Sequence, residues 1–190
     1  MRKSLFLFVL VCLCAATGNA QLFKKIVPAG NNISNAVAQV ALHFQSNYYA
    51  IQGEELPPDA GRMLYRSTLN LPGAAYSVIY RFGESADSSA AFESLLYEGE
   101  NYKEALKAYK LAFRQVKGTK FTACADKISF DGTLQEPEES VRFTSSILYA
   151  TASCKPYEHF MAEVEMQQSI EGYKVKLFLH SRKKDQDRYE

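Results

Sequence analysis

Three histidines and a pair of glutamates are the residues in this sequence whose chemistry suits acid–base catalysis. His43 lies in a segment where apolar residues recur with helical spacing, whereas His159 and Glu163 lie where apolar and polar residues alternate. Because a helix of this kind packs on a sheet, folding can bring His43, His159 and Glu163 together as one acid–base group. A Gly-x-Ser-x-Gly nucleophile elbow is absent from the sequence. A small exported enzyme with an unrecognised His/Glu site is therefore one alternative for the function.

Glu163 and Glu165 are two residues apart in an alternating segment, so they share one face of the predicted strand, about 7 Å apart. Two carboxylates in a cleft can divide the roles of acid and base. Val164 and Met166 occupy the opposite face, which is the pattern of a half-buried strand with its polar side in water. The pattern therefore favours a solvated pair, and we assign no catalytic residue.

Metal and cofactor sites are not indicated by any spacing in the sequence. The acidic residues match no calcium-loop pattern, and the ten glycines are scattered singly rather than gathered in a phosphate-binding loop. Neither Cys124 nor Cys154 has a second cysteine or histidine at zinc-finger spacing. We therefore expect no metal and no cofactor.

Residues 1–20 have the three-part pattern of a secretory signal peptide. Arg2 and Lys3 precede an apolar run over residues 5–16, and Gly18 and Ala20 supply small residues before a cleavage point at Gln21. The run is shorter than the about 20 residues that a membrane helix needs. We expect a secreted or periplasmic protein with no transmembrane segment after cleavage; an uncleaved N-terminal anchor is the alternative.

Export changes the interpretation of the four cysteines. Cys12 and Cys14 leave with the signal peptide, so the mature chain keeps Cys124 and Cys154. Two cysteines in an oxidising compartment predict one disulfide bond. The alternative is a pair of separate buried thiols that pack as small apolar side chains.

The charge balance argues against a nucleic-acid partner. The full chain has 22 basic and 21 acidic residues, and loss of Arg2 and Lys3 leaves 20 basic residues against 21 acidic ones. Proteins that neutralise phosphates usually carry a clear basic excess. We therefore expect no nucleic-acid partner, and either a small apolar ligand or a partner protein.

Aromatic residues are the most unusual feature of the composition: twelve Tyr and twelve Phe occur with no Trp. Tyrosines that line a sheet can offer an apolar pocket with hydrogen-bonding groups at its rim. We predict such a pocket between helices and sheet, lined by Phe44, Tyr48, Tyr80, Tyr109 and Tyr149. The alternative is that these rings fill the core, since aromatic residues favour strands in any case.

The elements that must position these residues follow from periodicity and from turn signals. An apolar stripe from Ile33 to Ile51 predicts a long first helix. Strands are expected over 63–71 and 75–82, around Pro72-Gly73. Two helices should follow, over 85–96 and from Gly99 to Gly118. Alternating residues then predict four strands, over 121–130, 140–151, 157–168 and 173–180.

This order predicts an α+β domain with a long N-terminal helix, a β-hairpin, two helices and a four-stranded antiparallel meander, the helices packed on one face of a curved sheet. The order of elements resembles the cystatin-like folds, in particular the nuclear-transport-factor-like group. We expect a signal peptide over 1–20, an exit segment over 21–30, one domain over 31–180 and a charged flexible tail over 181–190. The favoured function is non-enzymatic binding or interaction; besides the enzyme, a structural envelope protein is an alternative.

Overall fold

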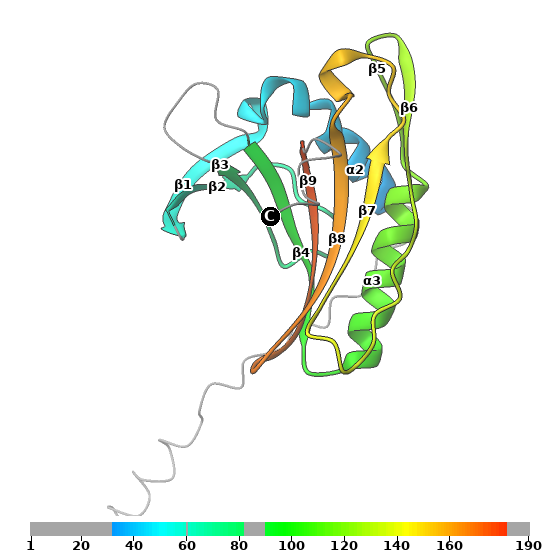
Figure 1. Cartoon of the computed structure of the whole chain (residues 1–190). Helices are drawn as coiled ribbons and strands as arrows, with labels where there is room; N and C mark the ends of the chain where they lie inside the picture. The colour runs from blue at the N-terminus through cyan, green and yellow to red at the C-terminus, as the bar shows by residue number, and fades with distance from the viewer. Residues whose placement is uncertain (1–31, 60, 82–89, 182–190) are drawn as a thin grey trace, which may run out of the picture.

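The structure is a computed structural model that describes residues 32–59, 61–81 and 90–181. In this part of the chain, one antiparallel sheet of nine strands carries two α-helices on one face (Figure 1). The expected signal peptide, exit segment and nearly all of the charged tail lie outside the described residues. The helices are α2 (Asn32–Leu42) and α3 (Tyr102–Lys117), and the strands are β1 (Gln52–Asp59), β2 (Arg62–Ser67), β3 (Tyr76–Arg81), β4 (Ala90–Gly99), β5 (Lys120–Ala123), β6 (Asp126–Gly132), β7 (Phe143–Ala150), β8 (Phe160–Ser169) and β9 (Gly172–Ser181).

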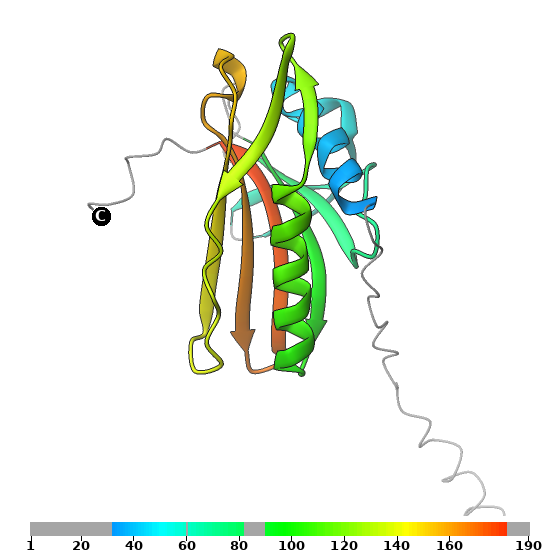
Figure 2. The same cartoon turned by 90° about the vertical axis from the view of Figure 1, so that its right-hand side faces the viewer.

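The strands are ordered β1-β2-β3-β4-β9-β8-β7-β6-β5 across the sheet, so β4 and β9 are neighbours although α3 and four strands separate them in sequence. After β4, α3 crosses the sheet to its far edge, and β5 to β9 return strand by strand to β4. Figure 2 shows α2 and α3 in front of the sheet, on the same side. We call the opposite side, on which no described helix packs, the helix-free face.

The nine-stranded sheet shows that the expected fold class is wrong: residues 32–59, 61–81 and 90–181 contain neither a long N-terminal helix nor a separate four-stranded meander. The first helix ends at Leu42, and it cannot continue to Ile51 because Asn47 and Tyr48 take left-handed backbone conformations, with φ of 51° and 59°. Two short 3-10 turns, Phe44–Ser46 and Tyr49–Ile51, replace its remaining turns. The nuclear-transport-factor-like layout, which requires that helix, is withdrawn with it.

The second correction concerns residues 85–96, where the spacing of apolar residues predicts a helix. The structure instead places β4 over Ala90–Gly99, in the centre of the sheet. Residues 90–97 are all buried, because both faces of this strand are covered. A strand that is apolar on both faces loses the two-residue alternation, and its apolar residues then also fit a helical period. Residues 82–89 lie outside the described part of the chain.

The sheet also gains β1, in a segment that contains Gly53 and Pro57-Pro58 and for which no strand was predicted. β1 is an edge strand that pairs with β2 on one side. An edge strand tolerates proline, since the missing N–H can face away from the ladder. The pairing is irregular, with register shifts between Gln52 and Glu55 and between Leu56 and Asp59.

Helix α3 forms where the sequence predicted a helix, and its ends explain why. The side chain of Asn101 accepts hydrogen bonds from the backbone N–H groups of Lys103 (2.9 Å) and Glu104 (3.2 Å), which caps the first turn. Gly118 follows the last turn. The buried face of the helix packs on β4, β9, β8, β7 and β6 through Ala105, Tyr109, Ala112, Phe113 and Val116.

Replacement of Asn101 by alanine is expected to lower the free energy of unfolding by about 1 kcal/mol, because two N–H groups lose their acceptor. Urea unfolding measures the change. Asn101→Asp keeps a capping oxygen and should stay within about 0.5 kcal/mol of the wild type. Equal losses in both variants would show that the cap does not stabilise α3.

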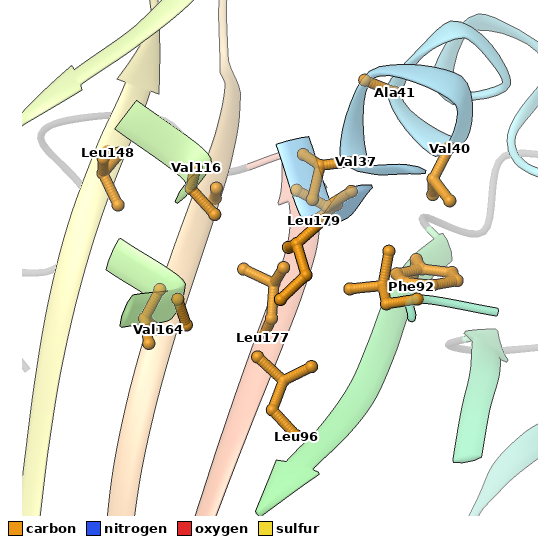
Figure 3. Packing of buried hydrophobic residues seen from close by; sticks show 14 of the residues in the cluster. Val37, Val40, Ala41, Phe92, Leu96, Val116, Leu148, Val164, Leu177 and Leu179 are labelled. Carbon is orange, nitrogen blue, oxygen red and sulfur yellow. The ribbon is translucent and has the colours of Figure 1, made fainter. Parts of the chain in front are cut away.

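The hydrophobic core lies between the two helices and the sheet. Figure 3 shows Val37 of α2 beside Leu179 and Val40 beside Phe92, whereas Val116 of α3 lies near Leu148 of β7 and Val164 of β8. An aromatic cluster continues this core beside α2, and it consists of Phe44, Tyr48, Phe121, Phe130, Tyr157 and Phe160. No helix of the described residues is long and apolar enough to cross a membrane.

The predicted disulfide between Cys124 and Cys154 is confirmed, with a Cα–Cα distance of 6.3 Å. Cys124 lies in the tight turn between β5 and β6, with a positive φ of 52°. Cys154 precedes the short turn that leads into β8. The bond therefore ties the β5–β6 hairpin to β8 beside the aromatic cluster.

Candidate functional site

The structure divides the five aromatic residues predicted to line a pocket between the two faces of the sheet. Phe44, Tyr48 and Tyr109 lie on the side of the helices, where they pack in the core. The ring of Phe44 stacks on Phe160 at a centroid distance of 4.3 Å. The buried hydroxyl of Tyr48 donates to the carbonyl of Leu179 (2.9 Å), and that of Tyr109 shares a hydrogen bond with Ser146 (2.5 Å).

The helices pack closely on the sheet at the gap found between them. A gap of about 20 Å³ lies between Ile33, Leu96 and Ala112. That volume admits about one water molecule. This gap is too small for a ligand of the predicted kind.

Tyr80 and Tyr149 lie on the helix-free face instead. Tyr80 pairs with Ala91 of β4, and Tyr149 pairs with Met161 of β8. Three strands, β4, β9 and β8, separate the two tyrosines. The five predicted residues therefore do not line one common pocket.

The acid–base group proposed from the sequence is also divided. His43 lies just after α2, on the side of the helices, whereas Glu163 is directed to the helix-free face. The histidine beside Glu163 is His180 of β9, whose Nε2 lies 3.3 Å from Glu163 Oε2. This pairing follows from the register of β8 and β9, in which Glu163 lies opposite Phe178 and Met161 lies opposite His180.

Strand register gathers ionisable side chains on the helix-free face. Glu93 of β4 and Glu163 of β8 both lie opposite Phe178 of β9, one on each side. In the next row, Lys176 of β9 lies between Leu95 and Glu165. Residues at these positions share a face because side chains alternate along each strand. The central strands β4, β9 and β8 thus place three carboxylates around one lysine.

Two of these charges form a buried ion pair. Lys176 Nζ lies 2.9 Å from Glu93 Oε1, and the Glu93 side chain is only 2% exposed. Tyr76 donates a further hydrogen bond to the same oxygen (3.1 Å). Burial and the neighbouring Glu93 carboxylate raise the pKa values of Tyr76 and Tyr80 far above their ordinary value, so both hydroxyls remain protonated donors.

A pocket of about 160 Å³ opens beside this ion pair. Cavities of comparable volume in other proteins hold a benzene ring. Its lining is mixed: ionisable side chains lie next to two aromatic rings and two small residues of β4. The lining residues are Arg62, Tyr80, Ala90, Ala91, Glu163, Glu165, Phe178, His180 and Ser181.

Glu165 is the carboxyl in this pocket without a hydrogen bond or ion pair among the described residues. Burial, and after it the nearby charge of Glu163, raise its pKa to about 7, although Lys176 opposes the rise. Glu163 is better satisfied, because Ser145 donates a hydrogen bond to it. His180 Nε2 is fully buried and makes no hydrogen bond, although it lies within ion-pair distance of Glu163.

A second, larger hollow of about 480 Å³ begins at Tyr80, which lines both. Its lining includes the apolar residues Leu56, Leu64 and Val78 on β1, β2 and β3, and it also includes the polar residues Arg66, Asn70 and Ser77. Arg62 lies at the junction, with its guanidinium 4.4 Å from the centre of the Tyr80 ring and paired with Asp59 (2.6 Å). We call the 160 Å³ hollow the polar pocket and the 480 Å³ hollow the apolar groove.

Replacement of Glu165 by glutamine is expected to remove a pH dependence of stability. The folded state holds the Glu165 proton up to about pH 7, whereas the unfolded chain releases it near the ordinary pKa of 4.5. The free energy of unfolding therefore falls as pH rises through this window. Because the side chain is partly exposed, screening by solvent reduces the loss to roughly 1–2 kcal/mol.

Urea unfolding at about pH 4 and about pH 8 measures this effect; both lie at the limits of the window set by the two pKa values. The variant should lose less stability than the wild type between the two pH values. Glu163, Lys176 and Glu93 also face this group and are present in both proteins. The same loss in both would mean that Glu165 is not the titrating group.

Sequence reasoning missed Glu93, Lys176, Glu165, His180 and Arg62 as members of one site. The signal was present in part, because Lys176, Phe178 and His180 alternate along one strand and share a face. Glu93 was hidden by the wrong prediction of a helix over 85–96. Within the described residues, no group of three or more His, Cys, Asp or Glu side chains is arranged to hold a metal ion.

Comparison of the chain with protein-family models, curated proteins and solved structures finds no match. Any functional conclusion therefore rests on the geometry of the polar pocket and the apolar groove.

Proposed function

We propose that this protein is an exported, non-enzymatic binding domain that takes a small ligand in the polar pocket of the helix-free face. The observation that carries the proposal is Glu165, a half-buried carboxyl in a pocket of about 160 Å³ without a hydrogen bond or ion pair among the described residues. Burying a polar group without a partner costs free energy. A ligand that supplies the partner would recover that cost, and the packed space between helices and sheet offers no such site.

Export is supported by two independent features of the chain. Residues 1–20 have the pattern of a signal peptide. The Cys124–Cys154 disulfide is of the kind that persists in oxidising compartments. A secreted or periplasmic location is consistent with both.

An acid–base enzyme is the second candidate, and one observation favours it. A carboxyl with a pKa of about 7 in a pocket can both take up and release a proton near neutral pH. The base would then be Glu165, which lines the same pocket as His180, rather than the group of His43, His159 and Glu163. We favour binding because, among the described residues, no hydrogen bond joins Glu165 to Ser181, the serine of the pocket lining.

The experiment that tests the proposed function fills the polar pocket and uses three probes with one carbon skeleton: hexylamine, hexanoate and hexanol. Amide chemical shifts of ¹⁵N-labelled protein are recorded with each probe. We expect at least one probe to shift the resonances of β4, β8 and β9 around Ala91 and Phe178. Ala91→Phe, which places a ring in the pocket, should abolish those shifts.

Gln167→Phe is the matched control, because Gln167 is exposed on β8 and lies outside the pocket lining. It should leave the shifts unchanged. Absence of shifts with all three probes would refute a binding function at this face. Turnover of a probe, seen as new resonances of the product, would instead support the enzyme.

A further inference from the structure

We propose that the ligand carries a primary ammonium group on an apolar chain, with the ammonium between Glu163, Glu165 and His180 and the chain in the apolar groove. This inference rests on the proposed function and names the class of ligand that the site would take. Three properties of the site carry it: its charge, its hydrogen-bond acceptors and its continuity with apolar surface.

Among the described residues, the fixed charges around the polar pocket leave an excess of carboxylates. Lys176 forms an ion pair with Glu93 at 2.9 Å, and Arg62 forms one with Asp59 at 2.6 Å. Glu163 and Glu165 then face the pocket from neighbouring positions on one side of β8, and no described lysine or arginine forms an ion pair with Glu165. A cation between the two carboxylates would relieve their mutual repulsion, whereas an anion would add to it.

The arrangement of acceptors fits a primary ammonium group better than other cations. An ammonium carries three N–H donors and has no acceptor. The pocket presents carboxylate oxygens of Glu163 and Glu165, and Nε2 of His180 is buried there without a hydrogen bond. In the neutral tautomer with a lone pair on Nε2, His180 supplies the third acceptor. A quaternary ammonium has no N–H to offer these groups.

Two aromatic rings complete the cation site. Tyr80 and Phe178 both line the pocket, and ring faces attract cations. Tyr80 already holds one cation in this way, since the Arg62 guanidinium lies 4.4 Å from its ring centre. Phe178 lies between Glu93 and Glu163 in the sheet register, so its ring adjoins the carboxylates.

The apolar groove indicates that the rest of the ligand is an apolar chain. It meets the polar pocket at Tyr80 and runs over Leu64, Val78 and Leu56. Its volume of about 480 Å³ is three times that of the polar pocket, at about 160 Å³. A chain of several methylene groups that starts from an ammonium in the pocket would bury apolar surface there, and each buried CH₂ adds about 0.8 kcal/mol at most.

The test measures the affinities of hexylamine, hexanoate, hexanol and ethylamine for the folded protein by calorimetry. We expect hexylamine to bind about tenfold or more tightly than hexanol, since a charged hydrogen bond contributes about 1.5–3 kcal/mol. Ethylamine should bind more weakly than hexylamine, because it cannot fill the groove. Glu165→Gln and Glu163→Gln should each weaken hexylamine about tenfold.

Glu98→Gln is the matched control. It also removes one carboxylate, from the far end of β4, where Glu98 pairs with Lys174 at 2.9 Å and does not line the pocket. It should leave the affinity for hexylamine within about twofold. Glu165→Gln removes no hydrogen bond or ion pair among the described residues, so this variant should fold. Its affinity for hexylamine therefore tests the charge argument even if Glu163→Gln fails to fold.

The two proposals fail in different ways. Binding of hexanoate in the pocket with no preference for hexylamine would overturn the ammonium inference and leave the binding function standing. An equal loss of affinity for hexylamine in Glu165→Gln and Glu98→Gln would also overturn the ammonium inference. The attraction of the protein for the cation would then come from its overall charge and not from the pocket. Absence of binding by every probe would overturn both.

Discussion

Replacement of Phe160 by alanine is expected to lower the free energy of unfolding by about 3–5 kcal/mol. Phe160 is 1% exposed and lies at the centre of the aromatic cluster. Its ring stacks on Phe44 at 4.3 Å and contacts Tyr157 and Phe130 at centroid distances of 5.5 and 5.6 Å. The disulfide and α2 border this cluster, which limits how far the surroundings can collapse into the cavity.

Thermal or urea unfolding measures the loss, which corresponds to a fall in Tm of roughly 6–20 °C for a domain of this size. Phe143→Ala is the control, because Phe143 is 51% exposed at the start of β7. It should cost less than about 1 kcal/mol. Similar losses for the two variants would mean that the cluster around Phe160 does not stabilise the fold.

The second large effect concerns the ion pair under the candidate site. Replacement of Lys176 by methionine should lower the free energy of unfolding by about 3–5 kcal/mol, because it leaves the buried Glu93 carboxylate without its cation. The hydrogen bond from Tyr76 remains and compensates only in part. Removal of both charges in Glu93→Leu/Lys176→Met should restore most of the lost stability, since a buried ion pair adds little over apolar residues of similar size.

Lys174→Met is the matched control on the same strand and the same face. Lys174 pairs with the more exposed Glu98 and Glu171, so its loss should cost less than about 1 kcal/mol. A double variant as unstable as Lys176→Met alone would show that packing by the lysine chain, rather than the uncompensated Glu93 charge, causes the loss.

The fold was predictable from the sequence where local signals act alone. Helix α3 has one continuous apolar face, the cap Asn101 and the terminal Gly118, and it needs no distant residue to define it. The disulfide followed from the number of cysteines in the mature chain. The turn signal at Pro72-Gly73 likewise lies between two strands that the structure contains, β2 and β3.

The prediction failed where tertiary contacts override local pattern. The apolar stripe continues past Leu42, yet the helix ends there. The left-handed backbone at Asn47 and Tyr48 then lets the Tyr48 hydroxyl reach the carbonyl of Leu179, 131 residues away. β4 is buried on both faces because α3 covers one face and the curled sheet and its charged side chains cover the other. No local rule separates such a strand from a buried helix.

The candidate site was hidden for the same reason. Glu163 and Glu165 were correctly placed on one face of a strand, and His180 on one face with Lys176. Their meeting depends on β9 pairing with β4 and β8 at once, and α3 and the strands β5 to β8 separate β4 from β9 in the chain. A solvated face was therefore the natural interpretation of two alternating glutamates.

The central claim is that a ligand binds on the helix-free face and not between helices and sheet. The most direct measurement is an isotope-filtered nuclear Overhauser experiment on labelled protein with unlabelled hexylamine. We predict contacts from the amine end of the probe to the Phe178 and Tyr80 rings and the Ala91 methyl group. Contacts to Phe44, Tyr48 and Tyr109 on the side of the helices would contradict the claim.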